Sequence, residues 1–363
     1  MSEYIRDSVT NRMGVLTLDR PAALNALSIG MIRAMTRALL AWRENPNVDA
    51  VLVQSSSERS FCAGGDIRFL YEAGRSTPET GSPAMEDFFT EEYILDHLIH
   101  HYPKPYISLM DGIVMGGGMG IGQNGTACRT RIVTERTKMA MPEVKIGMFP
   151  DVGGSYFLSR TPGQVGTYLG VAGEVIGAVD ALYAGLADVF IPSPQLPALM
   201  ERLKTTTAKN SHATIREFAA PFQAQAAPDK GIFAVQRVRI ERHFSHDSVP
   251  AIMTSLEEDA EPFAQQTLAA MKTRSPLMMC VTLEQIRRGA TMLMADCLRM
   301  ERSMVRYCYA CGEVLEGIRA MVIAKDHAPR WTPAALHEVT PEMVESFFHP
   351  VWPGFAHPLR DLQ

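Results

Sequence analysis

Two acidic residues provide the first candidate for chemistry in this sequence. Glu143 and Asp151 stand eight positions apart and are separated by an apolar stretch, in the segment MPEVKIGMFPDVGG at residues 141–154. An apolar environment raises the pKa of a carboxyl group and excludes water, which suits a general base or a nucleophile. A structural role is the alternative: Glu143 would lie in the first turn after Pro142, and Asp151 would cap the next helix.

Two glycine turns are the second candidate. Residues 61–67 read FCAGGDI and residues 112–120 read GIVMGGGMG, each after a predicted strand. Three consecutive glycines cost about 0.5–1 kcal/mol each relative to alanine, which indicates that the backbone there contacts something closely. Two such turns could place two N–H donors around one carbonyl oxygen, as an oxyanion requires. The alternative for the first turn is a tight connection in which Asp66 caps a helix that starts at Ile67.

Other motifs lack the context that their chemistry needs. Residues 120–125 (GIGQNG) match a dinucleotide-binding pattern, but residues 126–135 show no apolar helical face and Pro142 precedes the acid downstream. Cys308 and Cys311 form a single pair, which is weak support for zinc, and the histidines within residues 97–101 fall on the outer face of a predicted helix. A Gly-x-Ser-x-Gly nucleophile elbow is absent from the sequence. We therefore expect no metal ion and no redox cofactor.

Composition narrows the class of protein. The 363 residues include 35 basic and 40 acidic side chains, for a net charge of −5, and 46% are hydrophobic. This balance disfavours a nucleic-acid-binding surface. Six cysteines in so long a chain are not a disulfide scaffold. The first residues lack a secretory or transit pattern, and no apolar stretch approaches the roughly 20 residues that cross a bilayer. We expect a soluble cytoplasmic protein with no membrane partner.

The elements that must position these residues alternate along the first half of the chain. Strands are predicted at 15–18, 48–54, 105–115, 131–133 and 138–140. Ser28 is predicted to cap a helix whose apolar face runs from Ile29 to Trp42, and Asn45-Pro46 to end it. Strands and helices in this order indicate an α/β fold.

After about residue 195 the pattern changes. Strand signals fade, and long helix-compatible runs appear, such as residues 277–323. Residues 205–228, rich in Ala, Thr, Gln and Lys with two prolines, are predicted to be a hinge or a surface excursion. We expect a core domain over residues 1–195 and a helical C-terminal region over residues 196–363.

Taken together, these motifs resemble the crotonase (enoyl-CoA hydratase/isomerase) superfamily. The resemblance rests on their order: Arg20-Pro21, then NAL at residues 25–27, CAGGDI, GIVMGGGMG, MPE and FPDVGG. It implies a spiral of ββα units with a mostly helical C-terminal region, and an acyl-CoA substrate. It also implies that the N–H groups of Gly65 and Gly117 form the oxyanion hole, and that Asn25, Ala26, Leu27 and Ala63 contribute to CoA binding.

Within the superfamily, the chain is similar to the 3-hydroxyisobutyryl-CoA hydrolase branch. Hydratases carry a second glutamate where this chain has Gly120, and usually a glycine where it has Asp151. The TEEY segment at residues 90–93 matches the branch, in which the second glutamate, here Glu92, lines the acyl pocket. Similarity extends to SPLMMCVTLEQIRRG (residues 275–289) and EGIRAMVIAKDHAPRW (residues 316–331). One departure is residues 126–138, a longer connection interpreted as a loose surface segment.

The resemblance implies hydrolysis of a short 3-hydroxyacyl-CoA thioester in valine catabolism. Glu143 would attack the carbonyl or activate water, and Asp151 would assist. Substrate contacts would come from Glu92, Gly117, Glu143 and Asp151. The alternatives are an enoyl-CoA hydratase or isomerase, a hydrolase of another short acyl-CoA such as 3-hydroxypropionyl-CoA, and a non-catalytic binding module. The resemblance also implies a homo-oligomer formed through the C-terminal helices, and a region at residues 196–363 that serves as a lid and completes the acyl pocket.

Overall fold

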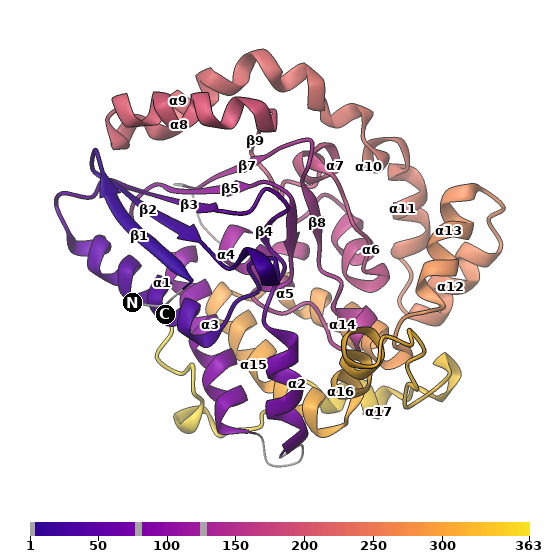
Figure 1. The fold of residues 1–363 in the computed structure, drawn as a ribbon. Coiled ribbons are helices and arrows are strands. Elements are labelled where there is room, and N and C mark those ends of the chain that lie inside the picture. Colours follow the sequence, from indigo (N-terminus) through magenta and orange to yellow (C-terminus); the bar gives the residue numbers. More distant parts are fainter. Residues whose placement is uncertain (1–3, 77–81, 124–128) are drawn as a thin grey trace. The chain divides into compact units, whose positions relative to one another are not determined.

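The computed structural model describes residues 4–76, 82–123 and 129–363 (Figure 1). Its contacts divide the chain into two compact units. The first comprises Met1–Gly65, Ile94–Ala140 and Ile176–Ala234, and the second Asp66–Tyr93, Met141–Val175 and Val235–Gln363. Each unit is therefore assembled from three separate stretches of chain. The sequential boundary expected at residue 195 stays a prediction.

The first unit contains two sheets. A six-stranded sheet has the order β1 (Ile5–Thr10), β2 (Met13–Leu18), β3 (Ala50–Ser55), β5 (Tyr106–Met110), β7 (Arg129–Val133) and β9 (Val189–Phe190). A three-stranded sheet has the order β4 (Ser60–Cys62), β6 (Ile113–Met115) and β8 (Lys138–Ala140). All pairings are parallel except that of β1 with β2. The α/β prediction is confirmed.

Consecutive strands alternate between the two sheets. In the pairs β3/β4, β5/β6 and β7/β8, the first strand joins the large sheet and the second joins the small one. The single strand predicted over residues 105–115 is thus two strands, because the chain turns at Asp111 and Gly112 between β5 and β6. This repeated alternation is the expected ββα spiral. It also means that β4, β6 and β8 end at the same edge of the small sheet.

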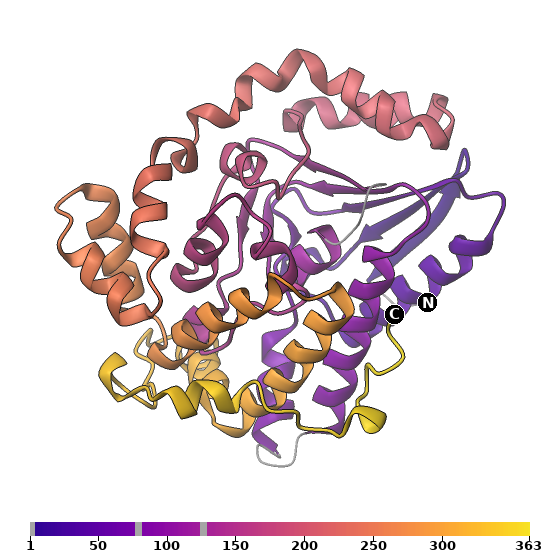
Figure 2. The same cartoon turned by 180° about the vertical axis from the view of Figure 1, so that it is seen from behind.

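Helices cover the large sheet of the first unit. They are α1 (Ile29–Glu44), α4 (Gly117–Gln123), α7 (Ala178–Tyr183), α8 (Leu196–Thr205), α9 (Ser211–Ala219) and the second half of α3 (Pro83–His100). The predicted cap of α1 is confirmed, since the Ser28 side chain accepts a hydrogen bond from the Met31 N–H. Helices α8 and α9 run along the sheet in both views (Figures 1 and 2).

The segment predicted to be a hinge or surface excursion is instead part of this packing. Residues 205–228 include α9, whose Ile215 and Ala219 join the same buried cluster as Leu52 and Ile107 of the sheet. The polar composition misled because only one face of α9 needs apolar residues. Residues 129–133 of the supposed loose connection form β7, buried between β5 and β9, and residues 124–128 lie outside the described residues.

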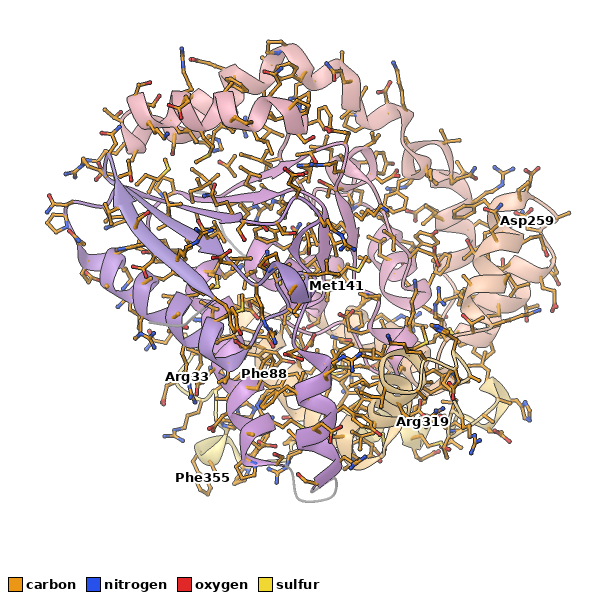
Figure 3. The ribbon with its side chains drawn as sticks, in the orientation of Figure 1. Arg33, Phe88, Met141, Asp259, Arg319 and Phe355 are labelled. Atoms are coloured by element: carbon orange, nitrogen blue, oxygen red, sulfur yellow. The ribbon has the colours of Figure 1, made fainter. Side chains whose placement is uncertain are left out.

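The second unit is helical. It contains α2 (Ile67–Ser76), the first half of α3, α5 (Gly154–Leu158), α6 (Val165–Ala172), α11 (Arg237–Phe244), α12 (Val249–Glu257), α13 (Pro262–Met271), α14 (Pro276–Gly289), α15 (Met294–Ala310), α16 (Glu313–Ile318) and α17 (Pro341–Ser346). The four-residue α10 (Ile232–Val235) crosses from one unit to the other. Phe88 and Met141, labelled in Figure 3, are both buried side chains of this unit. The helices predicted within residues 277–323 are confirmed.

Candidate active site

The first glycine turn follows β4 in the first unit. Its position is set by two backbone hydrogen bonds, from the Ala63 N–H to the Leu24 oxygen (3.1 Å) and from the Leu27 N–H to the Gly64 oxygen (2.8 Å). Gly64 has φ +99°, a conformation that side chains disfavour. A Cβ there would lie 3.1 Å from the Met115 oxygen. Gly64 therefore has a left-handed backbone conformation, and the end of β6 packs closely against it.

The second glycine turn lies beside the first because β4 and β6 pair in parallel. Ser60 aligns with Ile113 and Cys62 with Val114, so the chain leaves both strands at the same edge. At that edge the Gly117 nitrogen is 3.6 Å from the position of a Cβ on Gly64. Gly118 packs still more tightly, since a Cβ on it would lie 2.2 Å from the Cys62 oxygen. The glycine triplet thus allows two backbone segments to touch.

The N–H groups of Gly65 and Gly117 are the donors that the sequence predicted for an oxyanion hole. Gly117 is the first residue of α4, so its N–H has no partner within the helix. Among the described residues, neither N–H donates a backbone hydrogen bond outside helices and strands. Two unused donors on adjacent turns can stabilise a negative oxygen. Their role in catalysis stays a prediction.

The segment predicted to seat CoA lies against the first glycine turn. Asn25 is fully buried, and its amide donates to the Ser55 hydroxyl (2.7 Å) while its oxygen accepts from the Arg20 N–H (2.7 Å). This side chain therefore holds the loop. Ala26 and Ala63 are partly exposed, whereas Leu27 is buried. Contacts to a ligand at this segment would come from the two alanines.

In the second unit, Glu143 begins a 3-10 turn that ends at Ile146. Its side chain is 6% exposed, and Oε2 has no hydrogen-bond partner among the described residues. Burial, and after it the charge of Asp151, raise the pKa of the Glu143 carboxyl well above its usual value. Glu143 does follow Pro142, as the structural alternative required. A carboxyl with only that structural role would lie in solvent, whereas the Glu143 carboxyl is buried.

Asp151 does not cap a helix. The N-cap of α5 is Gly153, which has no side chain, and the Asp151 carboxyl instead accepts a 2.7 Å hydrogen bond from the Tyr93 hydroxyl. Both side chains are buried. Burial raises the pKa of Asp151 to about 6, and the hydrogen bond from Tyr93 limits that rise.

Glu92, from α3, completes the set of acids expected from the sequence. It is buried, and Oε1 lacks a hydrogen-bond partner among the described residues. Burial raises its pKa well above the usual value, and the charge of Asp151 adds to the rise. Glu92, Glu143 and Asp151 thus interact electrostatically within one unit. The first unit contains Gly65, Gly117 and the predicted CoA-binding residues.

Two further residues of the second unit reach the loop that carries Asp151. Glu301 of α15 accepts hydrogen bonds from the N–H groups of Gly153 (2.8 Å) and Ser155 (2.9 Å) and from the Ser155 hydroxyl. Gln285 of α14 donates to the Pro150 oxygen at 2.5 Å. Gln285 lay within a segment recognised by resemblance, without an assigned role. No sequence signal marked Glu301, because its contacts are to residues about 150 positions away.

Several buried polar atoms of this unit have no hydrogen-bond partner among the described residues. They include Glu92 Oε1, Glu143 Oε2, Gln285 Oε1 and the Tyr309 hydroxyl, besides Glu86 Oε1, Thr282 Oγ1 and Arg302 Nη1. An unpaired buried polar atom costs about 1–3 kcal/mol. Atoms of this kind, gathered around raised-pKa carboxyls, are typical of a site completed by a polar ligand.

Most of the rejected motifs are placed as their weak context indicated, but His100, expected on the outer face of its helix, is buried. Gly120 and Gly122 lie inside α4, not in a strand-to-helix turn, so the dinucleotide interpretation is wrong. Cys308 belongs to α15 and Cys311 follows its end as a free cysteine. Within the described residues, no group of three or more His, Cys, Asp or Glu side chains is arranged to hold a metal ion. No helix among those residues has the length and apolarity to cross a membrane.

Comparison with known proteins agrees with this geometry. A curated relative from Gallus gallus named "3-hydroxyisobutyryl-CoA hydrolase, mitochondrial" is 39% identical over 341 residues, covering 93% of this chain and 86% of the relative. A Homo sapiens protein of the same name is 35% identical over 339 residues, covering 92% and 86%.

Solved structures carry different names. A carnitinyl-CoA dehydratase from Mycobacterium thermoresistibile superposes with a TM-score of 0.88 at 37% identity, covering 97% of this chain and 98% of that one. An enoyl-CoA hydratase from Rhodobacter sphaeroides superposes with a TM-score of 0.84 at 34% identity, covering 96% and 98%. A family model described as enoyl-CoA hydratase/isomerase matches residues 13–348. The glycine turns, the ββα spiral and the similar proteins all indicate the same family. The chain belongs to the enoyl-CoA hydratase/isomerase family.

Proposed function

We propose that this protein hydrolyses a short 3-hydroxyacyl-CoA thioester, namely 3-hydroxyisobutyryl-CoA, to 3-hydroxyisobutyrate and CoA, as a step of valine breakdown. The observation that carries the proposal is the buried pair Glu143 and Asp151, with Asp151 oriented by Tyr93. The names of the relatives from Gallus gallus and Homo sapiens support the same reaction.

In the proposed mechanism, the thioester oxygen accepts hydrogen bonds from the N–H groups of Gly65 and Gly117. These donors are backbone groups held by parallel strand pairing, so they need no reorganisation as the oxygen becomes negative. Ala26 and Ala63 contact CoA beside the first turn. A second buried carboxyl, Glu92, hydrogen-bonds the acyl group in its pocket.

Glu143 then acts at the carbonyl carbon. Either it attacks directly, forming an acyl-enzyme anhydride that water cleaves, or it removes a proton from the attacking water. In both routes a C–O bond forms, the C–S bond breaks, and CoA leaves as a thiolate that takes up a proton. The pKa of Glu143 is well above its usual value while that of Asp151 is about 6. Asp151 orients the substrate hydroxyl or the water.

Hydration or isomerisation of an enoyl-CoA is the second candidate. The titles of the two similar solved structures favour it. The position where hydratases have a second glutamate is Gly120, inside α4, and glycine cannot transfer a proton. Hydrolysis therefore explains the residues present better than hydration does.

The decisive experiment is a panel of thioesters assayed for free thiol and for enoyl absorbance in parallel. It contains 3-hydroxyisobutyryl-, 3-hydroxypropionyl-, 3-hydroxybutyryl- and crotonyl-CoA. We expect thiol release to be fastest from the branched hydroxy ester, although one methyl group in a pocket is worth only about 1–3 kcal/mol. A change in enoyl absorbance without thiol release would replace hydrolase with hydratase. Binding without any turnover would indicate a non-catalytic binding module.

Three accompanying expectations remain predictions. We expect no metal or redox cofactor, with CoA entering only as part of the substrate. A homo-oligomer formed through the C-terminal helices is checked by light scattering on the purified chain. The sequence favours the cytoplasm, whereas the names of the relatives include the word mitochondrial, and fractionation of expressing cells tests the compartment.

A further inference from the structure

The loop that carries Asp151 is held by helices from the C-terminal part of the chain. Gly289 of α14 lies against Ser155, where a Cβ would come within 2.3 Å of the Ser155 oxygen. Gln285 of the same helix donates to the Pro150 oxygen. The loop is therefore packed closely against α14 at both of its ends.

Glu301 of α15 provides the polar part of this support. Oε2 accepts from the Gly153 N–H at 2.8 Å, and Oε1 accepts from the Ser155 N–H at 2.9 Å and from the Ser155 hydroxyl. All three bonds go to residues two to four positions beyond Asp151. The side chain is fully buried, and among the described residues no ion pair includes it. Such a carboxyl is costly unless its oxygens are well satisfied.

A purely stabilising role does not account for this arrangement. Burial of a carboxyl without a cation gives little or no net stability, whereas a packed apolar residue would give more. The carboxyl instead fixes the orientation of the loop, because its two oxygens accept from the N–H groups of Gly153 and Ser155. Tyr93 bonds Asp151 itself from α3. Tyr93 therefore holds the Asp151 side chain, while Glu301 holds the backbone that follows Asp151.

We propose that Glu301 is the positioning residue of Asp151, acting through the backbone of residues 153–155. The inference rests on the proposed function only in that Asp151 takes part in turnover. It makes part of the C-terminal helical region a component of the catalytic apparatus, although Glu301 itself need not touch substrate.

Glu301→Gln is the primary test. The amide keeps the size of the side chain but replaces one oxygen with an NH2 group, which cannot accept a hydrogen bond from the donor that it faces. We expect kcat for 3-hydroxyisobutyryl-CoA to fall about 10–100-fold with KM changed less than about threefold. The acidic limb of the pH profile of kcat/KM is expected to move, because the environment of Asp151 changes.

A double-mutant cycle separates positioning from general damage. If Glu301 acts through Asp151, then adding Glu301→Gln to Asp151→Asn slows the enzyme no further than Asp151→Asn alone. Fully additive losses, or a single variant with wild-type kcat and pH profile, would overturn the proposal. Ser155→Ala removes one donor with less risk to folding, and the expected loss in kcat is about threefold.

Asp180→Asn in the first unit is the matched control. Asp180 is also a buried carboxyl that accepts from a backbone N–H, that of Phe233, at 2.8 Å. We expect a lower melting temperature with kcat and pH profile unchanged. If the wild-type chain released no thiol, the proposed function would fail. Amide hydrogen exchange at Gly153 and Ser155, faster in Glu301→Gln, would still test whether Glu301 holds the loop.

Discussion

The two units position their candidate residues by different means. In the first unit, glycine turns present backbone N–H groups, and strand pairing between neighbouring segments places them. In the second unit, Asp151 and its loop are held by side chains from α3, α14 and α15, which are far apart in sequence. Backbone donors do not titrate, whereas the acids have raised pKa values. We therefore expect substitutions in the first region to reduce activity by displacing the donors. In the second region, changes of protonation should reduce activity as well.

The largest expected effect lies in the acid region. Glu143→Gln retains shape but removes the group that attacks or activates water. We expect kcat to fall by roughly 10³–10⁴-fold, near the upper range for such a group. Binding of a CoA thioester, followed by calorimetry, should remain within a few-fold of wild type. Wild-type-like thiol release in this variant would refute the mechanism.

The glycine region should respond to a single methyl group. In Gly118→Ala the new Cβ would meet the Cys62 oxygen at 2.2 Å, so the turn must move away from β4. Displacing the donors should cost about 10²-fold in kcat, as removal of an oxyanion donor does.

Gly177→Ala is the control for the glycine region. Gly177 has φ −94°, and nothing lies within 4 Å of its ideal Cβ. The substitution should change neither thiol release nor, by more than about 0.5 kcal/mol, the free energy of unfolding in urea. If both alanine variants behaved alike, close packing of the turn would not be what matters.

Tyr93→Phe tests the link between geometry and protonation. The Tyr93 hydrogen bond lowers the pKa of Asp151, so its loss should raise that pKa above about 6. The acidic limb of kcat/KM should therefore shift to higher pH, with kcat reduced about tenfold. An unshifted profile with reduced kcat would mean that Asp151 is not the group that titrates.

The smallest expected effect concerns stability. Burial raises the pKa of Glu301 from its ordinary 4.5 to about 8, so between these values the folded protein binds a proton that the unfolded chain releases. Stability due to this group is therefore lost as pH rises through that window. We expect the melting temperature to decrease from pH 5 to pH 8, by the equivalent of about 1 kcal/mol or more. The decrease should be weaker in Glu301→Gln, and equal slopes would contradict the assignment.

Much of the fold was predictable because its signals are local. The Ser28 cap and the helix after it, the valine-rich β3 and the glycine turns depend on residues close together in sequence. Local signals failed where burial is one-sided, as in α9, and where a strand turns between two sheets, as at Asp111. Among the three-residue strands, β8 was predicted at residues 138–140, whereas β4 was missed.

The candidate site divides in the same way. Residue types and order made Glu143, Asp151 and the two glycine turns candidates, and the resemblance added Glu92, the two donor glycines and the family. Only the tertiary structure decided that Asp151 is bonded by Tyr93 rather than capping a helix, and that Glu301 reaches its loop. A hydrogen bond between residues about 150 positions apart leaves no pattern in a single sequence, because either partner is an ordinary residue until folding removes water and brings the two together.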